Sequence, residues 1–302
     1  MRYNDFNSYL KTKFGCRVQK ITIDAGFTCP NRDGRSSTGG CIYCNSKGSG
    51  TGLFNKGISI SEQIIQGKSA LSKRYNAKKF LAYFQSFSNT YGPVERLKKF
   101  YDESLSFDDV VGISIGTRPD CVNDEIITLL ESYSKNKLVW IEYGLQSAHD
   151  DTLNFINRGH NFKTFKDAVD LTKNRGIKIC THLIIGLPNE NKEKIIETAK
   201  IISSMGIDGV KLHSLYVIKD TKLEDLYNKG QYKCLDQKEF AEIVCDILEV
   251  LPPDIIIQRL VADPHKNELV APEWSMKKTE NLSLILKILE NRDSWQGKKF
   301  ER

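Results

Sequence analysis

Residues 18–44 read VQKITIDAGFTCPNRDGRSSTGGCIYC, and this stretch decides how the rest of the chain is interpreted. It begins with a short apolar run, 18–24, that is typical of a buried β-strand. Three cysteines, Cys29, Cys41 and Cys44, then fall on one glycine-rich loop in the spacing C-x11-C-x2-C. Glycines let a backbone wrap closely around an ion or cluster, whose sulfurs then accept backbone N–H bonds. The stretch therefore predicts a metal site on the loop after a first strand.

The three-cysteine loop leaves the kind of metal open. Structural zinc takes four ligands, yet the nearest further cysteines or histidines in sequence are Cys16 and Cys121, and no second C-x2-C pair exists. A fourth zinc ligand would have to come from a distant residue. A 4Fe–4S cluster held by three cysteines would instead leave one iron free to bind a small molecule. Spacing alone also leaves chance clustering as an alternative.

Beyond the loop, short apolar runs alternate with amphipathic segments. The predicted strands are 18–24, 80–85, 110–116, 138–146, 177–186 and 209–215. The predicted helices between them are 61–75, 94–105, 123–133, 162–175 and 191–205. Such alternation implies right-handed βαβ units, and six of them fall short of the eight in a complete barrel. We expect an α/β fold: a partial (β/α)6 barrel of the TIM type.

The pattern changes from about residue 216. A helix is predicted at 236–251, a β-like run at 254–260 and a last helix at 276–291. We therefore expect residues 1–215 to form the partial barrel with its N-terminal lead-in, and residues 216–302 to form a small C-terminal extension that packs on the barrel.

Composition excludes several classes of protein. The chain has 302 residues, 40% hydrophobic and 27% charged, so a disordered or fibrous chain is excluded. It carries 44 Lys+Arg against 38 Asp+Glu, a net charge of +6. Its first residues lack the apolar run of a signal peptide, and no window approaches the roughly 18 apolar residues of a membrane span. We expect a cytoplasmic protein, whose eight cysteines stay reduced and serve as core, catalytic or metal-binding residues.

The cysteine loop resembles that of the radical S-adenosylmethionine (SAM) superfamily, in which an aromatic residue precedes the last cysteine, as Tyr43 does here. The usual spacing there is C-x3-C-x2-C. The longer first gap is similar to that in the radical SAM half of the elongator catalytic subunit, and in a stand-alone bacterial family of about this length. The resemblance implies a 4Fe–4S cluster on Cys29, Cys41 and Cys44, SAM as second cofactor, and an electron donor such as flavodoxin or ferredoxin.

The same resemblance implies which strand ends bind SAM. Residues 83–90 occupy the place where the superfamily holds the SAM amino group through backbone carbonyls, although its usual Gly-Gly-Glu motif is absent. Gln146 is implied as a ribose or carboxylate contact, Arg158 as a charge-assisted partner of the carboxylate, and Leu187 as part of the turn under the adenine. The full implied set is Tyr43, Gln85, Ser86, Ser88, Asn89, Thr117, Arg118, Gln146, Arg158 and Leu187.

These residues also have plainer interpretations. Arg118 and Arg158 would be surface charges at helix ends, Gln146 would only close a strand, and the Gly-Leu-Pro at Leu187 would be only a turn. His160 is more often a capping or surface histidine than a catalyst. The placement of these residues at successive predicted strand ends favours the shared site.

Three residues are candidates for catalysis. Lys211 and His213 lie two apart in the sixth predicted strand, so alternation points both to one face. A lysine inside a barrel needs a partner, and for Lys211 this would be SAM or an anionic substrate; the alternative is an outward pair at the strand end. Cys121 follows Arg-Pro-Asp near the active face and is the third candidate, whereas Cys180 and Cys245 are expected in the core.

The resemblance implies tRNA as the substrate, with carboxymethylaminomethyl-uridine at the wobble position converted towards aminomethyl-uridine. The alternatives are a radical SAM enzyme that acts on a small metabolite or protein side chain, and a non-enzymatic zinc-binding RNA module. Net charge is below the strong basic footprint of a nucleic-acid binder. Local basic clusters favour RNA binding, and Tyr9 and Phe14 beside the first of them could stack on exposed bases. The alternative is that these clusters are ordinary solvated faces. They are Lys11, Lys13, Arg17, Lys20; Lys73, Arg74, Lys78, Lys79; Lys277, Lys278; and Lys298, Lys299, Arg302. The sequence does not indicate the oligomeric state.

Overall fold

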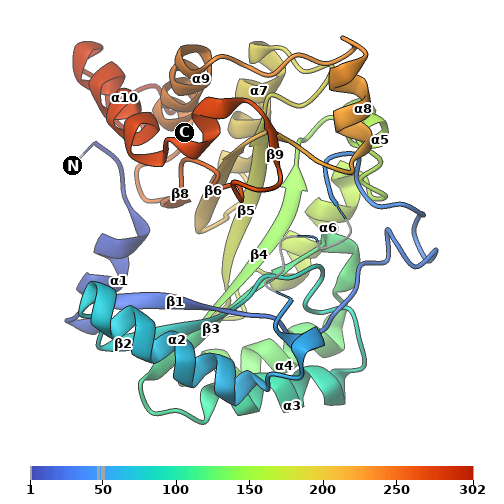
Figure 1. Cartoon of the computed structure of the whole chain (residues 1–302). Helices are drawn as coiled ribbons and strands as arrows, with labels where there is room; N and C mark the ends of the chain where they lie inside the picture. Colours follow the sequence, from blue (N-terminus) through green and yellow to red (C-terminus); the bar gives the residue numbers. More distant parts are fainter. Residues whose placement is uncertain (1, 46–47, 49–51, 302) are drawn as a thin grey trace.

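A single curled sheet of parallel strands organises the protein (Figure 1). The computed structural model describes residues 2–45, 48 and 52–301. Its seven-stranded sheet has the order β1-β2-β3-β4-β5-β6-β8, with every neighbouring pair parallel. The strands are β1 Val18–Ile23, β2 Lys79–Phe84, β3 Val110–Thr117, β4 Leu138–Gln146, β5 Lys178–Ile185, β6 Gly209–Ser214 and β8 Ile256–Arg259. The partial barrel of the TIM type is thus confirmed. The sequence predicted six strands, and the β-like run 254–260 supplies the seventh.

Helices cover the outer face of the sheet, and most begin at a side chain that accepts a backbone N–H (Figure 1). Ser59 forms a capping box with Glu62 at the start of one of them. The main helices are α2 Ile60–Tyr75, α3 Val94–Leu105, α4 Asp124–Ser134, α6 Phe162–Thr172, α7 Lys192–Ser203, α9 Gln237–Val250 and α10 Lys278–Asn291. No helix in the described part of the chain has the length and apolar character needed to cross a membrane.

Shorter elements connect these parts. Two short strands, β7 Val217–Ile218 and β9 Leu269–Ala271, pair antiparallel outside the main sheet. The short helices are α5 Asp150–Phe155 and α8 Lys222–Asn228, and the 3-10 turns are η1 Phe54–Lys56, η2 Pro119–Cys121 and η3 Glu273–Met276. The cysteine loop runs between β1 and η1.

The first helix, α1 Phe6–Phe14, was not predicted from the sequence, and it closes the bottom of the barrel. Its buried residues Phe6 and Leu10 pack in one apolar cluster with side chains from β1, β2, β4, β5 and β8. The ring of Phe6 meets Trp140 edge-on, with centroids 5.6 Å apart. We call this layer the apolar floor; its buried members are Phe6, Leu10, Val18, Leu81, Leu138, Trp140, Cys180 and Ile256.

The side of the barrel between β1 and β8 is not closed by strand pairing among the described residues. The lead-in to α1 runs along β8 instead, where the carbonyl oxygen of Asn4 accepts the N–H of Ile257 at 2.8 Å. Across the gap, Lys20 donates to Gln258 Oε1 at 2.6 Å. The half-barrel therefore has an opening on this side, above α1.

The apolar floor predicts a measurable contribution of α1 to stability. Leu10 is 1% exposed, so Leu10→Ala should lower the free energy of unfolding by about 2–5 kcal/mol, through lost burial and a residual cavity. Chemical denaturation followed by circular dichroism measures this. Lys11→Ala, an exposed neighbour on the same helix, is the control and should change stability by about 0.5 kcal/mol or less. Equal effects of the two substitutions would contradict the role of α1 as a plug.

Candidate functional site

Side-chain amide groups hold the cysteine loop against the segment between α5 and α6. Asn31 donates from Nδ2 to the carbonyl oxygen of Asn157 at 2.6 Å, and Asn157 donates from its own Nδ2 to the carbonyl oxygen of Gly40 at 2.8 Å. Gly159 permits this approach, because a Cβ there would lie 2.3 Å from Asn31 Oδ1, at a φ of +74°. The two segments therefore fix the loop at the carboxyl ends of the strands.

The three predicted metal ligands, Cys29, Cys41 and Cys44, all line one cavity of about 350 Å³, which we call the lumen cavity. Nη1 of Arg158 and Nδ2 of Asn31 each lie 3.6 Å from Cys41 Sγ. Burial raises the pKa of the Cys44 thiol. Among the described residues, no three Cys, His, Asp or Glu side chains already stand in a metal-binding arrangement. A donor set of three thiols with N–H groups aimed at sulfur nevertheless fits a thiolate-held iron–sulfur cluster.

Most of the residues predicted to bind SAM face the same cavity. They come from the cysteine loop after β1, from the ends of β2, β3 and β4, and from the loops that follow these strands, as expected of residues at the carboxyl ends of parallel strands. Lys211 and His213 also line it, so the inward orientation expected from alternation is confirmed. The predicted SAM-binding residues that line the lumen cavity are Tyr43, Gln85, Ser88, Thr117, Arg118, Gln146 and Arg158.

Four predicted site residues are not part of the cavity lining: Ser86, Asn89, Leu187 and Cys121. Asn89 donates to the carbonyl oxygen of Gly116 at 2.8 Å and so fastens the β2 loop to β3. Leu187 packs in a separate apolar cluster, and Ser86 is buried behind the wall. Burial raises the pKa of Cys121 to about 12, which keeps its thiol protonated at neutral pH and makes it a poor nucleophile.

Arg118 and Arg158 are buried, so their interpretation as surface charges is wrong. Arg118 donates from Nε and Nη2 to the carboxylate of Asp120 at 2.8 and 2.7 Å, and from Nη1 to the carbonyl oxygen of Arg158 at 2.6 Å. Arg158 in turn donates to the carbonyl oxygen of Gly144. His160 is also buried, not a surface residue, and burial together with the two arginines lowers its pKa to about 3.

Two residues of the cavity wall have strained backbones. Gln146 has a φ of 80° and Phe87 a φ of 60°, in the region that non-glycine residues rarely adopt. The side chain of Gln146 folds over Gly144, where a Cβ would lie 2.7 Å from Gln146 Nε2. Strain of this kind is concentrated at functional sites, and at Gln146 it lies on the cavity wall.

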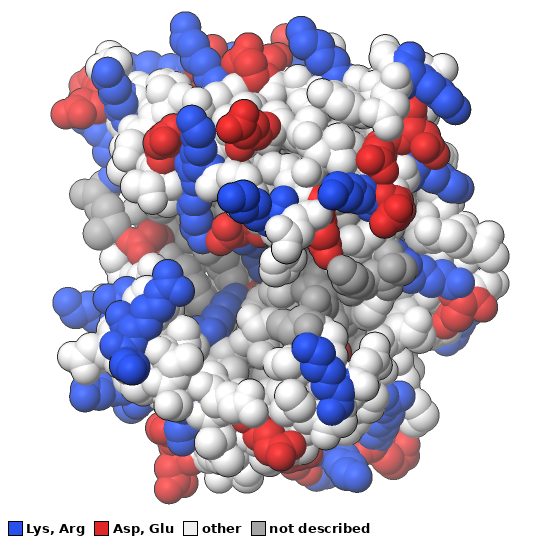
Figure 2. Space-filling view, viewed as in Figure 1, with Lys and Arg blue, Asp and Glu red and all other residues white. Residues whose placement is uncertain are grey.

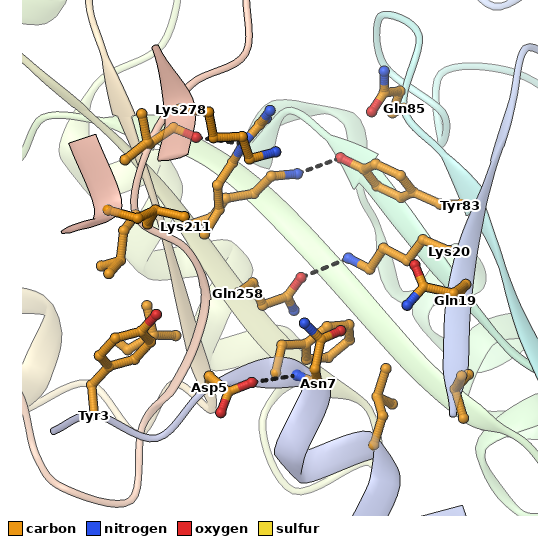
Figure 3. Close-up of a pocket in the computed structure, with 18 residues that line it drawn as sticks. Tyr3, Asp5, Asn7, Gln19, Lys20, Tyr83, Gln85, Lys211, Gln258 and Lys278 are labelled. Atoms are coloured by element: carbon orange, nitrogen blue, oxygen red, sulfur yellow. Dashed lines mark hydrogen bonds between the residues drawn. The ribbon is translucent and has the colours of Figure 1, made fainter. Parts of the chain in front are cut away.

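A buried carboxylate, Glu142 on β4, lies at the centre of the lumen and is 0% exposed. Lys20 Nζ contacts Oε1 at 2.5 Å and Lys211 Nζ contacts Oε2 at 3.0 Å. His182 Nε2 lies 2.7 Å from Oε2, and Ser114 donates to Oε1 at 2.5 Å. We call these five residues the charge layer. Figure 3 shows Lys211 reaching across to Tyr83, whose hydroxyl lies 2.6 Å away.

The charge layer fixes its own protonation states. Burial acts to raise the pKa of Glu142, but Lys20 and Lys211 hold it well below its usual range. Burial lowers the pKa of Lys211 to about 8 and that of His182 to about 4. Burial, followed by the charge of Arg259, holds the pKa of His213 well below its usual value. At neutral pH the layer therefore contains an ionised carboxylate, two lysines and neutral imidazole.

Sequence reasoning missed Glu142, His182, Lys20 and Tyr83 as site residues. The sequence does carry a signal for them, because each is a polar residue within an otherwise apolar strand run. A charged residue in a strand buried on both faces needs a partner of opposite charge. Lys211 was expected to meet SAM or an anionic substrate, and the structure gives it Glu142 as partner.

A parallel half-barrel with a cysteine loop and polar strand ends around one cavity is the architecture of a cofactor-dependent enzyme. The chain belongs to the radical SAM superfamily, whose family model matches residues 31–202, and a radical SAM C-terminal domain model matches residues 207–291. Enzymes of this superfamily use a 4Fe–4S cluster and SAM. Membership decides against a non-enzymatic zinc-binding RNA module.

Individual proteins of similar sequence or fold show to which members of the superfamily the chain is related. It is 40% identical over 301 residues to the protein YtqA of Bacillus subtilis (strain 168), an alignment that covers 100% of this chain and 94% of YtqA. It is 34% identical over 162 residues to Elongator complex protein 3 of Mus musculus, covering 52% of this chain and 29% of that protein. The fold matches archaeal Elp3 of Methanocaldococcus infernus with a TM-score of 0.68 at 19% identity, covering 92% of this chain and 64% of that one.

The charge layer makes a prediction for Glu142→Gln. The substitution leaves Lys20 and Lys211 without their carboxylate and should lower the free energy of unfolding at pH 7 by about 3–5 kcal/mol. Because the folded pKa of Glu142 is depressed, its stabilisation is present above the unfolded value of about 4.3 and is lost as pH falls towards the folded pKa. Urea denaturation at pH 7 and at lower pH measures both effects.

Glu131→Gln is the matched control, since Glu131 pairs with Arg175 in a more exposed position. It should change stability by about 1 kcal/mol or less. A wild-type-like stability of Glu142→Gln at pH 7 would show that the carboxylate is not needed by the lumen.

Proposed function

We propose that this radical SAM enzyme acts on tRNA and converts carboxymethylaminomethyl-uridine at the wobble position towards aminomethyl-uridine. The observation that supports this most is the relationship to Elongator complex protein 3, in sequence over about half of this chain and in fold over nearly all of it. The resemblance to the radical SAM half of the elongator subunit implies that the group modified is the substituent at C5 of a wobble uridine. An electron donor such as flavodoxin or ferredoxin belongs to this proposal.

In this proposal Cys29, Cys41 and Cys44 hold the cluster. Cys29 lies just outside the matched range 31–202, so its assignment rests on its place in the lumen cavity. When bound, the cluster and SAM supply a 5′-deoxyadenosyl radical that removes hydrogen from an unactivated C–H bond. Arg158 and Asn31 donate N–H groups towards Cys41, which would stabilise it as a thiolate.

The position of each side chain relative to the cavity supports two proposed roles for the predicted SAM contacts. Tyr43, Gln85, Ser88, Thr117 and Gln146 face the cavity and would contact SAM directly. A second group would shape the wall without contacting SAM. Asn89 and Arg118 are hydrogen-bonded to other parts of the protein, and Ser86 and Leu187 do not line the cavity. Arg158 would serve cluster and SAM carboxylate together.

Lys211 and His213 would lie on the substrate side of SAM. Lys211 is held by Glu142 and Tyr83, so it would position a substrate rather than move freely. His213 lies beside His182, with ring centroids 5.7 Å apart. Both line the lumen cavity and are the candidates for contact with the reacting group.

A basic face supports an RNA substrate. Arg17 and Arg74 lie over the ring of Tyr75 at 5.2 and 5.0 Å, and Lys79 lies over Phe14 at 5.6 Å. These contacts join two clusters that are separate in the sequence, and Figure 2 shows Lys and Arg gathered over α1 and α2. The face lies at the amino ends of β1 and β2, beside the side opening. Arginine and aromatic groups of this kind bind phosphates and stack on bases.

The cluster assignment predicts the effect of Cys41→Ala. Anaerobically purified wild-type protein should be brown with about four iron per chain and should cleave SAM to 5′-deoxyadenosine under reducing conditions. Cys41→Ala should abolish cleavage. Cys16→Ala, a cysteine outside the lumen cavity, is the control and should keep both iron and cleavage. Retained cleavage in Cys41→Ala would refute its role as ligand.

The substrate is tested by nucleoside mass spectrometry of tRNA from a strain in which the gene is deleted. The expected result is accumulation of carboxymethylaminomethyl-uridine and loss of aminomethyl-uridine and its products. Complementation with the wild-type gene should restore the profile, and complementation with Cys41→Ala should not. An unchanged profile would remove tRNA as substrate and leave a small metabolite or a protein side chain.

A further inference from the structure

The side opening between β1 and β8 leads into a second cavity of about 460 Å³, which we call the side cavity. Figure 3 shows it from close by, with Lys20, Tyr83 and Lys211 projecting into it. The side cavity and the lumen cavity share four lining residues: Tyr83, Gln85, Lys211 and Arg259. These residues mark the junction through which a substrate group from the side would approach SAM.

The junction holds more positive charge than its acids neutralise. Lys20 and Lys211 share one carboxylate, that of Glu142. Arg259 adds a third cation: its Nε donates to the carbonyl oxygen of Val261 at 2.9 Å, and it forms no ion pair within the part of the chain that the structure describes. The neighbouring imidazoles are neutral at pH 7. Arg259 is half-buried, so its guanidinium is partly shielded from water and can pair with an anionic ligand in the cavity.

The other carboxylates on the two walls are engaged elsewhere. Asp5 caps α1 through Oδ1, which accepts the N–H groups of Asn7 and Ser8, and its Oδ2 is buried without a hydrogen-bond partner in the structure. Asp263 pairs with Lys278 at 2.9 Å. Glu268 on the outer rim of the lumen cavity accepts from Asn45 at 3.2 Å. None of these pairs with Arg259.

A second polar group in the side cavity lacks a partner. Gln258 accepts from Lys20 through Oε1, which fixes the orientation of its amide, because a lysine can only donate. Its Nε2 is buried without a hydrogen-bond partner in the structure. A free N–H donor thus lies on the same strand as Arg259, and both line the side cavity.

We infer that the junction binds a carboxylate carried on the substrate, with Arg259 as its principal partner and Gln258, Lys20 and Lys211 around it. The planar guanidinium of arginine matches a carboxylate with two parallel N–H bonds. The inference rests on the proposed function, in which the attacked substituent ends in such a group. Holding the carboxylate here would orient the adjacent C–H bonds towards the lumen cavity and select carboxylated over uncarboxylated substrates.

The depth of the junction below the protein surface favours a substrate carboxylate over an RNA backbone phosphate as its ligand. Lys211 is 6% exposed and Glu142 is 0% exposed, so only a narrow group at the end of a chain reaches this layer. A phosphodiester is flanked by two sugars and would stay at the surface. A terminal carboxylate on a short flexible substituent is both narrow and at the end of a chain, so it can reach this layer.

The test compares two anticodon stem-loop RNAs that differ in one group. One carries carboxymethylaminomethyl-uridine at the wobble position, and in the other the carboxylate is replaced by a carboxamide. Reconstituted wild-type holoenzyme with SAM should bind the carboxylate RNA roughly 10- to 100-fold more tightly, the range for a hydrogen bond to a charged group. Arg259→Gln should remove this preference while keeping the affinity for the carboxamide RNA, and Arg259→Lys should restore part of it.

Arg175→Gln is the matched control, because it removes the same charge from an arginine paired with Asp124 and Glu131 outside both cavities. It should keep the wild-type preference. A wild-type preference retained in Arg259→Gln, or no preference in the wild type, would overturn the inference.

A second arm separates this inference from the proposed function. N-methylglycine and its amide are titrated into the holoenzyme by calorimetry, without RNA. The carboxylate should bind in the wild type and weaken at least about 10-fold in Arg259→Gln. If neither RNA binds but N-methylglycine binds through Arg259, the tRNA proposal fails and the carboxylate site stands. If N-methylglycine does not bind through Arg259 and neither RNA binds, both fail.

Discussion

The rest of the structure depends on how the carboxylate of Glu142 is neutralised inside the barrel. A carboxylate that is 0% exposed cannot stay ionised without partners. Its partners come from separate strands: Lys20 from β1, Ser114 from β3, His182 from β5 and Lys211 from β6. β3 and β5 are the neighbours of β4, whereas β1 and β6 are not. The contacts of Lys20 and Lys211 with Glu142 therefore join strands that are apart in the sheet, and they favour a curled sheet over a flat one. The same contacts form the wall that a substrate would meet.

The lumen is consequently built in layers of different chemistry. The apolar floor, to which α1 contributes Phe6 and Leu10, fills the bottom of the barrel. The charge layer lies above it, and the cysteine loop and strained strand ends line the open end. A radical enzyme needs such a sequence of layers, because water and loose side chains would quench the radical, whereas fixed charges orient a substrate at no cost in reorganisation. If the substrate is a large molecule, as proposed, the opening between β1 and β8 would give it access from the side.

The sequence alone predicts most of the strands and helices, but it does not predict the helix α1 or the contacts between distant strands. Period and composition predicted six of the strands and the main helices, since each follows from local pattern. The sequence also predicted that Cys41 and Gln146 lie at one end of the sheet, because parallel strands share their carboxyl ends, and alternation placed Lys211 and His213 on one face of their strand. The helix α1 was missed, since its two buried residues make sense only against the floor. The pairing of Glu142 is a contact between distant strands, which local patterns do not encode. The family resemblance implies that Leu187 belongs to the turn under the adenine; in the structure its side chain packs in an apolar cluster with Ile184 and Leu215, which line the lumen cavity.

The central claim is that the lumen cavity holds an iron–sulfur cluster whose open iron binds SAM. Electron paramagnetic resonance of the anaerobically reduced protein, recorded with and without SAM, tests it most directly. The account predicts the signal of a reduced 4Fe–4S cluster that changes when SAM is added, because SAM coordinates the iron that the three cysteines leave free. A cluster signal that is insensitive to SAM, or reduced protein with no cluster signal, would contradict the account.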